Sequence, residues 1–351
     1  MKSRIQQRLQ SSKRRFDALV QSGQPIPTHE LGPLSLFYLW WSIETKEPSS
    51  FENALTLRDL AAATLVGVTT PFSSVDSPFA NHVSLKLWEE IGEPSSIWLA
   101  HNEQAIQDLE FASRPLMKQK RNSEYLYGVS GIGFIALQLD AHKLIRLVVD
   151  YLESDLVESE FGMISPVSLK VKEAWKGKIE GHHAGVGHGA SGPLLVLKYF
   201  SRIGPPNRRL ETLIATLTES ICNLAENEST PSPAVWCSGS LGIGHALLTP
   251  SKVPVTTRAK RVGMKIFRNG IDSSAHLPAD PSFCHGWAGV AQTAHRIQRL
   301  KAESVIERIL KMEAPTGSPE ILLGELGIAL TLMSAVSKFD LKWDRHLLLS
   351  N

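Results

Sequence analysis

Four residues with nucleophilic or metal-binding side chains stand one or two positions before a glycine, namely His188, Cys237, Cys284 and His285. Two thiolates and one imidazole form a donor set soft enough to select zinc. Three protein ligands leave a fourth position for water or substrate, which is typical of a catalytic zinc site. These residue types therefore favour a zinc site at Cys237, Cys284 and His285. The alternative is that each of them is an ordinary buried side chain.

A Gly-x-x-Gly motif recurs five times and must position these residues. Its copies begin at Gly128, Gly189, Gly239, Gly286 and Gly324, so that 38 to 61 residues separate successive first glycines. This spacing accommodates two helices and two connections, which indicates a repeat of helix pairs. The glycines permit close helix approach or a tight turn, and they are not a P-loop because no Gly-Lys-Ser/Thr follows them.

Two kinds of helix alternate along the repeats. Segments after the motifs, such as 132–139 and 328–335, are apolar nearly all round and predict buried inner helices. The segment 209–226 between motifs is amphipathic and predicts an outer helix. No strand pattern is convincing, so the sequence predicts an all-α chain of stacked helix pairs, as an open solenoid or a closed ring.

The repeat is clear from about residue 120 to 351. Residues 1–120 hold only degenerate candidates, at 32–41 and 78–99, and we expect one domain over 1–351. In stacked repeats, equivalent positions face a common axis. The donor residues named above, and Glu124 four positions before Gly128, should therefore converge at one end of the inner helices.

Several other residues have simpler interpretations. Trp236 and Trp287 are expected to pack the interior, and Cys222 is expected in the core of an outer helix. The remaining histidines near the motifs or on the helices after them are not expected to be ligands; these are His182, His183, His245 and His295.

Composition and charge limit the possible functions of the protein. The formal net charge is +2, and six basic residues without an acid lie in 1–16, so the rest of the chain is nearly neutral and nucleic acid is not an expected partner. A solvated first helix explains the basic run best, with docking to an acidic peptide or anionic membrane as the alternative. The sequence has only three cysteines and shows no secretory signal and no membrane-spanning segment. This favours a cytoplasmic protein.

Three motifs, in this order, resemble those of the lanthionine synthetase C-like family, the lanthipeptide cyclases. They are Gly187-His188-Gly189-Ala-Ser-Gly192, Trp236-Cys237-Ser-Gly239-Ser-Leu-Gly242 and Cys284-His285-Gly286-Trp-Ala-Gly289. The resemblance extends from about Glu124 to Leu349. It implies an α/α toroid, a double ring of seven inner and seven outer helices, with one zinc ion per chain bound by Cys237, Cys284 and His285.

The resemblance also implies a reaction and partners. The reaction is the Michael addition of peptide cysteine thiols to dehydroalanine or dehydrobutyrine, which closes thioether rings in a dehydrated precursor peptide. His188 matches the family's histidine near the metal and is the candidate general acid/base, with Glu124 as a second member. The precursor with its leader is the expected partner. A dehydratase and an ABC transporter, in a membrane-associated complex, are further candidates.

The chain departs from the family pattern at three positions. Pro233 stands where the family often has arginine, Ser238 where it has tyrosine, and Glu124 where it has aspartate. The proposed ligands are untouched, so the departures concern proton transfer and stabilisation of the enolate. The loss of the arginine and tyrosine, here Pro233 and Ser238, favours an alternative function, a non-catalytic zinc and thiol (glutathione-like) binding or scaffold protein of the same fold. A ring-of-helices zinc enzyme that transfers isoprenoids fits less well, because its zinc set usually includes a carboxylate.

Overall fold

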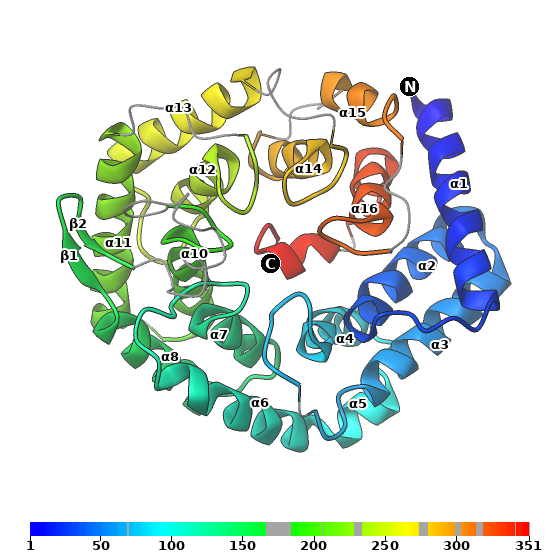
Figure 1. Cartoon of the computed structure of the whole chain (residues 1–351), viewed down its shortest axis with the longest axis horizontal. Helices are drawn as coiled ribbons and strands as arrows, with labels where there is room; N and C mark the ends of the chain where they lie inside the picture. The colour runs from blue at the N-terminus through cyan, green and yellow to red at the C-terminus, as the bar shows by residue number, and fades with distance from the viewer. Residues whose placement is uncertain are drawn as a thin grey trace. The chain divides into compact units, whose positions relative to one another are not determined.

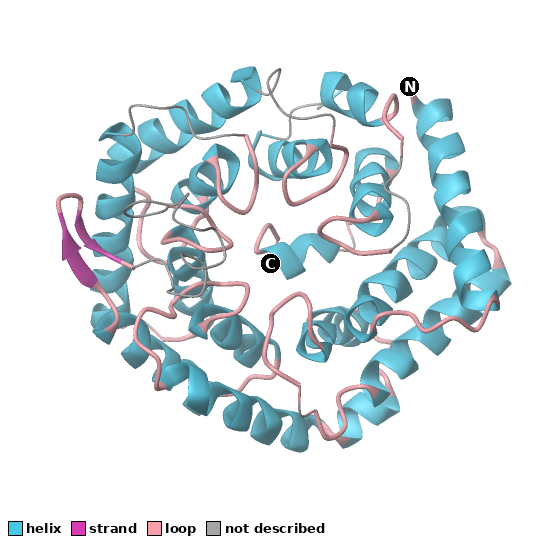
Figure 2. Ribbon diagram, viewed as in Figure 1, coloured by secondary structure: helices cyan, strands magenta, loops and turns pink. Residues whose placement is uncertain are grey.

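The computed structural model describes the chain except for residues 69, 166–183, 206, 228–233, 274–279, 299–302, 314–318, 341 and 351. Helices dominate this described part (Figure 2). Its only strands are β1 (Val157–Ser159) and β2 (Gly162–Ile164), which pair antiparallel as a short hairpin. The predicted all-α class is confirmed.

The chain divides into two compact units. Unit 1 consists of Met1–Thr70, Val75–Ala105 and Leu277–Asn351, and unit 2 consists of Pro71–Ser74 and Ile106–His276. Helix α6 (Asn102–Met117) starts in unit 1 and continues in unit 2. The single domain expected from the sequence stays a prediction.

Unit 2 is built of helix pairs in two layers (Figure 1). The inner helices are α7 (Val129–Gln138), α10 (Ser191–Ile203) and α12 (Ser240–Leu248). The outer helices are α8 (His142–Ser154), α11 (Arg208–Asn227) and α13 (Thr257–Ser273). Helix α10 packs between α7 and α12, and each inner helix packs against the outer helix that follows it. The predicted inner helices are buried nearly all round, whereas α8 buries one face through Leu144, Val148 and Leu152.

Unit 1 also contains helix pairs, including those of the N-terminal region where the repeat is degenerate. Its N-terminal elements are α1 (Lys2–Gln21), η1 (Thr28–Glu30), α2 (Leu31–Thr45), α3 (Pro48–Ala63), η2 (Pro78–Ala80), α4 (Asn81–Glu90) and α5 (Ser96–Ala100). Its C-terminal elements are α14 (Trp287–Gln298), α15 (Glu303–Ile309), α16 (Glu325–Val336) and η4 (Trp343–Leu347). Helix α2 packs against α3 and α4, and α16 packs against α1, α2 and α14. Of the two degenerate segments of the sequence, 32–41 lies within α2, and 78–99 spans η2, α4 and most of α5.

The basic run of α1 is only partly solvated. Arg15 Nη1 donates to Glu325 Oε2 at 2.6 Å, and Ser12 Oγ donates to Glu325 Oε1 at 2.5 Å. Lys13 is buried and lies 2.7 Å from Asp17. The solvated face predicted for this helix is therefore correct for residues such as Arg4, while Arg15 joins α1 to α16 and Lys13 pairs with Asp17 of α1 itself.

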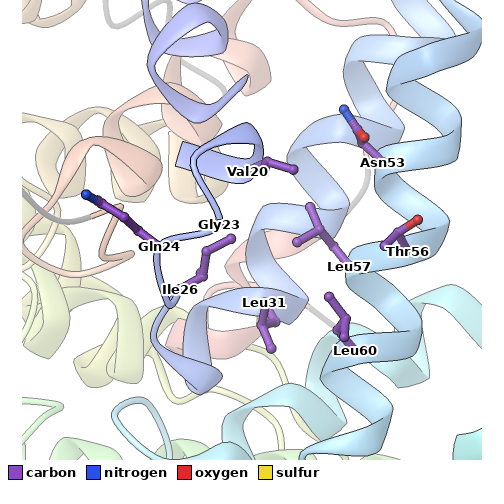
Figure 3. Close-up of a pocket in the computed structure, with 9 residues that line it drawn as sticks. All are labelled: Val20, Gly23, Gln24, Ile26, Leu31, Asn53, Thr56, Leu57 and Leu60. Atoms are coloured by element: carbon purple, nitrogen blue, oxygen red, sulfur yellow. The ribbon is translucent and has the colours of Figure 1, made fainter. Parts of the chain in front are cut away.

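Unit 1 contains a cavity of about 360 Å³ between the end of α1 and the helices α2 and α3 (Figure 3). Its apolar lining includes Val20, Ile26, Leu31, Leu57 and Leu60. None of its lining residues is ionisable, so it is separate from the site residues predicted from the sequence. Among the described helices, none is both long and apolar enough to cross a membrane.

Candidate metal centre and acid/base pair

The second glycine of the repeated motif lets a loop carbonyl close onto the start of the inner helix. A Cβ added at this position would lie 2.0 to 2.4 Å from the carbonyl oxygen of the residue six positions earlier, in the motifs that hold Gly131, Gly192, Gly242 and Gly327. Real Cβ atoms essentially never approach within 3.0 Å. The glycines therefore permit a tight turn, as predicted, and the turn fixes the loop that carries the candidate residues.

Main-chain hydrogen bonds join the loops that precede the inner helices of unit 2. Tyr125 and Leu126 donate to the carbonyl of Gly187 at 3.2 and 3.3 Å, and the Gly187 N–H donates to the carbonyl of Cys237 at 2.7 Å. The three loops consequently lie side by side in the same register. Glu124, His188 and Cys237 thus share one end of the inner helices α7, α10 and α12, as the repeat predicts for unit 2.

Glu124 and His188 form a hydrogen-bonded pair. The distance between His188 Nδ1 and Glu124 Oε2 is 2.5 Å, and the side chains are 12% and 2% exposed. The second carboxylate oxygen, Oε1, accepts the main-chain N–H of Tyr127 at 3.1 Å. With its Nδ1–H directed at a carboxylate, the imidazole presents Nε2 as its basic nitrogen. Such a pair can give or take a proton while the carboxylate stabilises the charged ring.

A buried aspartate supports the loop before Glu124. Asp155, just after α8, accepts the main-chain N–H of Arg121 at 2.6 Å and also the hydroxyl of Ser123. Burial raises the pKa of Asp155 above its usual range, and these hydrogen bonds oppose the rise. Sequence analysis missed Asp155 because nothing in its local pattern distinguishes it from other acids at the end of an amphipathic helix.

Sequence analysis also missed Tyr127. Its ring lies parallel to that of His188, with centroids 6.0 Å apart and an interplanar angle of 14°. A signal was present, because Tyr127 directly precedes the first glycine of its motif, as His188, Ser238 and His285 do in theirs. In these four motifs the residue at this position is exposed or half-exposed, whereas the residue directly before it is buried.

The other two proposed ligands lie in unit 1, in the loop before α14. The main-chain N–H groups of Phe283 and Cys284 donate to the carbonyl of Leu322 at 3.0 and 2.9 Å. The ring of Phe283 also meets that of Trp343, near the C-terminus, edge to face with centroids 5.7 Å apart. This loop is therefore held by the same type of bond as those of unit 2.

Within this loop, Cys284 and His285 fit a zinc site. Cys284 Sγ lies 3.7 Å from His285 Nε2, with the cysteine buried and the histidine exposed. Two ligands of a tetrahedral zinc ion, at the usual Zn–S and Zn–N distances, are separated by about 3.6 Å. Together with Cys237, which is 1% exposed in unit 2, the pair makes up a donor set that could hold a metal ion.

The structure also shows where most of the other residues singled out in the sequence lie. Trp236 and Trp287 are buried, Cys222 is in the core face of α11, and His245 lies on α12 with its Nε2 3.3 Å from the hydroxyl of Thr249. His295 lies on α14 and is half-buried. His182, His183 and Pro233 lie outside the described residues.

Comparison with known families gives a match over most of the chain. The lanthionine synthetase C-like protein family matches residues 95–348. The chain belongs to this family. All five residues predicted for the site of this lanthionine synthetase C-like protein, from Glu124 to His285, fall inside the matched range.

A solved structure, nisin cyclase, is similar to this lanthionine synthetase C-like protein. The TM-score is 0.74 at 16% sequence identity, over 98% of this chain and 97% of that chain. At this identity the likeness shows the fold, and the predicted α/α-toroid class is confirmed. Seven inner and seven outer helices stay a prediction. A comparison with curated proteins finds no match.

Proposed function

We propose that this lanthionine synthetase C-like protein is a zinc-dependent lanthipeptide cyclase. It would close lanthionine and methyllanthionine rings in a dehydrated precursor peptide. The main support is the Glu124–His188 pair, whose loop is joined by the Gly187–Cys237 hydrogen bond to the loop of a proposed zinc ligand. An acid/base group and a thiol ligand in adjoining loops suit a reaction that moves both a thiolate and a proton.

Cys237, Cys284 and His285 would hold one zinc ion. Zinc bound there lowers the pKa of a peptide thiol and makes a thiolate available near neutral pH. The donor set leaves a fourth position for that thiol. The two cysteine thiolates would contribute negative charge to the site, which favours a nucleophilic peptide sulfur.

The addition balances without any oxidant or reductant. The peptide sulfur forms a bond to the β-carbon of dehydroalanine or dehydrobutyrine, the carbon–carbon π bond breaks, and the α-carbon receives a proton in place of the one that the thiol loses. His188 would deliver the proton from Nε2. Glu124 holds Nδ1 at 2.5 Å and compensates the charge of the imidazolium.

The precursor peptide with its leader is the proposed partner. A dehydratase would supply the dehydrated residues, because an unmodified serine or threonine offers no double bond for a thiol to attack. We propose that the enzyme works in the cytoplasm, and that a complex with the dehydratase and an ABC transporter brings it to the membrane.

Mass spectrometry tests the proposal directly. The zinc-loaded protein is incubated with its dehydrated precursor, and the remaining peptide thiols are alkylated and counted. Cyclisation leaves the peptide mass unchanged and removes one alkylation site per ring. The precursor without enzyme is the control. Full alkylation after incubation with zinc-loaded protein would refute cyclase activity.

A second candidate function is a zinc and thiol binding or scaffold protein of the same fold. The observation that favours it is the half-exposed Ser238 in the loop of Cys237, where the family has tyrosine. Calorimetric titration with glutathione distinguishes it. Zinc-dependent binding of glutathione without any ring closure in the precursor would favour this function.

A further inference from the structure

Tyr127 contacts both members of the acid/base pair. Its main-chain N–H donates to Glu124 Oε1 at 3.1 Å, while Glu124 Oε2 is bound to His188 Nδ1 at 2.5 Å. Its ring lies nearly parallel to the imidazole of His188. The imidazole is therefore held at one edge by the carboxylate and has the nearly parallel tyrosine ring as a neighbour.

The backbone ties together the two loops that carry these rings. The loop of Tyr127 is joined to that of His188 by two main-chain hydrogen bonds, from Tyr125 and Leu126 to the carbonyl of Gly187. The two rings thus project from neighbouring positions of bonded loops. Tyr127 is 41% exposed and so contributes little to the core, which argues against a purely structural role.

We propose that Tyr127 is a positioning residue that holds the imidazole of His188 in the orientation required for proton transfer. This inference rests on the proposed function for its effect on rate, but not for its effect on the ring. The hydrogen bond to Glu124 fixes Nδ1 of the imidazole. The nearly parallel ring of Tyr127 beside it limits rotation of the imidazole about that bond and so keeps Nε2 in one direction.

Loss of this restraint should slow the chemical step of the reaction. A misplacement of about 1 Å can slow a reaction by about 100-fold. Tyr127→Ala should therefore lower kcat by about 10-fold or more and leave KM within about threefold, because Tyr127 acts through His188. Tyr127→Phe keeps the ring and should restore kcat to within about threefold of wild type.

Chemical labelling of His188 tests the positioning without any enzymatic assay. The rate of carbethoxylation of His188 by diethyl pyrocarbonate is measured by peptide mass spectrometry, with the exposed His142 of α8 as internal reference. Removing the neighbouring ring should raise the rate at His188 several-fold in Tyr127→Ala, because the imidazole is then less restrained, and Tyr127→Phe should leave the rate unchanged. The matched control is Phe111→Ala, which removes a 70% exposed aromatic ring of α6 and should change neither kcat nor labelling.

Metal content and thermal unfolding of each variant separate the proposal from general damage. Tyr127→Ala with wild-type zinc content, raised labelling of His188 and a lowered kcat supports the positioning role. Labelling within twofold of wild type would overturn it, and so would equal losses of kcat in the alanine and phenylalanine variants. If the wild-type protein closes no rings, the proposed function fails, and the labelling still decides whether Tyr127 orients His188.

Discussion

The main-chain N–H of Gly187 donates to the main-chain carbonyl of Cys237, with an N···O distance of 2.7 Å. This bond ties the loop of His188 to the loop of a proposed zinc ligand through the backbone. A Cβ added at Gly187 would lie 3.1 Å from Cys237 Cβ and 3.3 Å from its carbonyl oxygen. The distance between the two loops thus depends on the absence of a side chain at Gly187.

Gly187→Ala should crowd these two loops. We expect a loss of about 1–3 kcal/mol in the free energy of unfolding, from overpacking, together with weaker zinc binding. Urea denaturation measures the first effect, and competition with a chelator measures the second. Zinc affinity equal to that of wild type would show that the loop spacing does not control the site.

Cys284→Ala should lose zinc and activity together, because the donor set would fall to two side chains. His188→Ala should keep zinc and lose rate, because the imidazole moves a proton and does not bind the metal. Elemental analysis of the purified proteins checks both, with Cys222→Ala as the control for removal of a buried thiol in α11. Full zinc content in Cys284→Ala would refute the ligand set.

Gly242→Ala should destabilise the start of α12. The added Cβ would lie 2.1 Å from the carbonyl oxygen of Trp236, so the backbone would have to move to make room for it. We expect a loss of about 3 kcal/mol or more in the free energy of unfolding. Gly204→Ala is the control, because its Cβ would lie 3.6 Å from the carbonyl oxygen of Phe200, which is an ordinary van der Waals contact. Equal denaturation midpoints for the two variants would contradict the steric role of Gly242.

Glu30 should make the stability of the protein depend on pH. Burial raises its pKa from 4.5 to about 8, although the N–H of Ile321 donates to Oε1 at 3.0 Å. The folded protein therefore holds this proton more tightly than the unfolded chain. The resulting stability is fully present below pH 4.5 and is lost as the pH rises through about 8.

Glu30→Gln keeps an acceptor for Ile321 and removes the ionisation. The variant should be more stable than wild type at pH 8.5, by up to a few kcal/mol, and should depend less on pH. Urea denaturation at pH 5, 7 and 8.5 measures this, with Glu52→Gln on the exposed face of α3 as control. Parallel pH profiles for wild type and Glu30→Gln would argue against a buried proton.

The sequence alone determined the features that depend on local geometry and on residue type. Repeated glycines predicted the tight turns, because only glycine leaves room for the loop carbonyl. Apolar segments predicted the inner helices of unit 2, and the cysteine and histidine types predicted a zinc-binding donor set. The degenerate N-terminal segments also proved to be helical, in α2 for 32–41 and in η2, α4 and α5 for 78–99.

Only the tertiary structure decided which side chains become partners across long sequence separations. Glu124 and His188 are 64 residues apart, and their contact depends on the hydrogen bonds between two loops. The stacking of Tyr127, the support from Asp155 and the pairing of Arg15 with Glu325 depend likewise on how separate helices pack. Periodicity and spacing describe each segment by itself. The choice of partner is made by packing between segments, which no local pattern records.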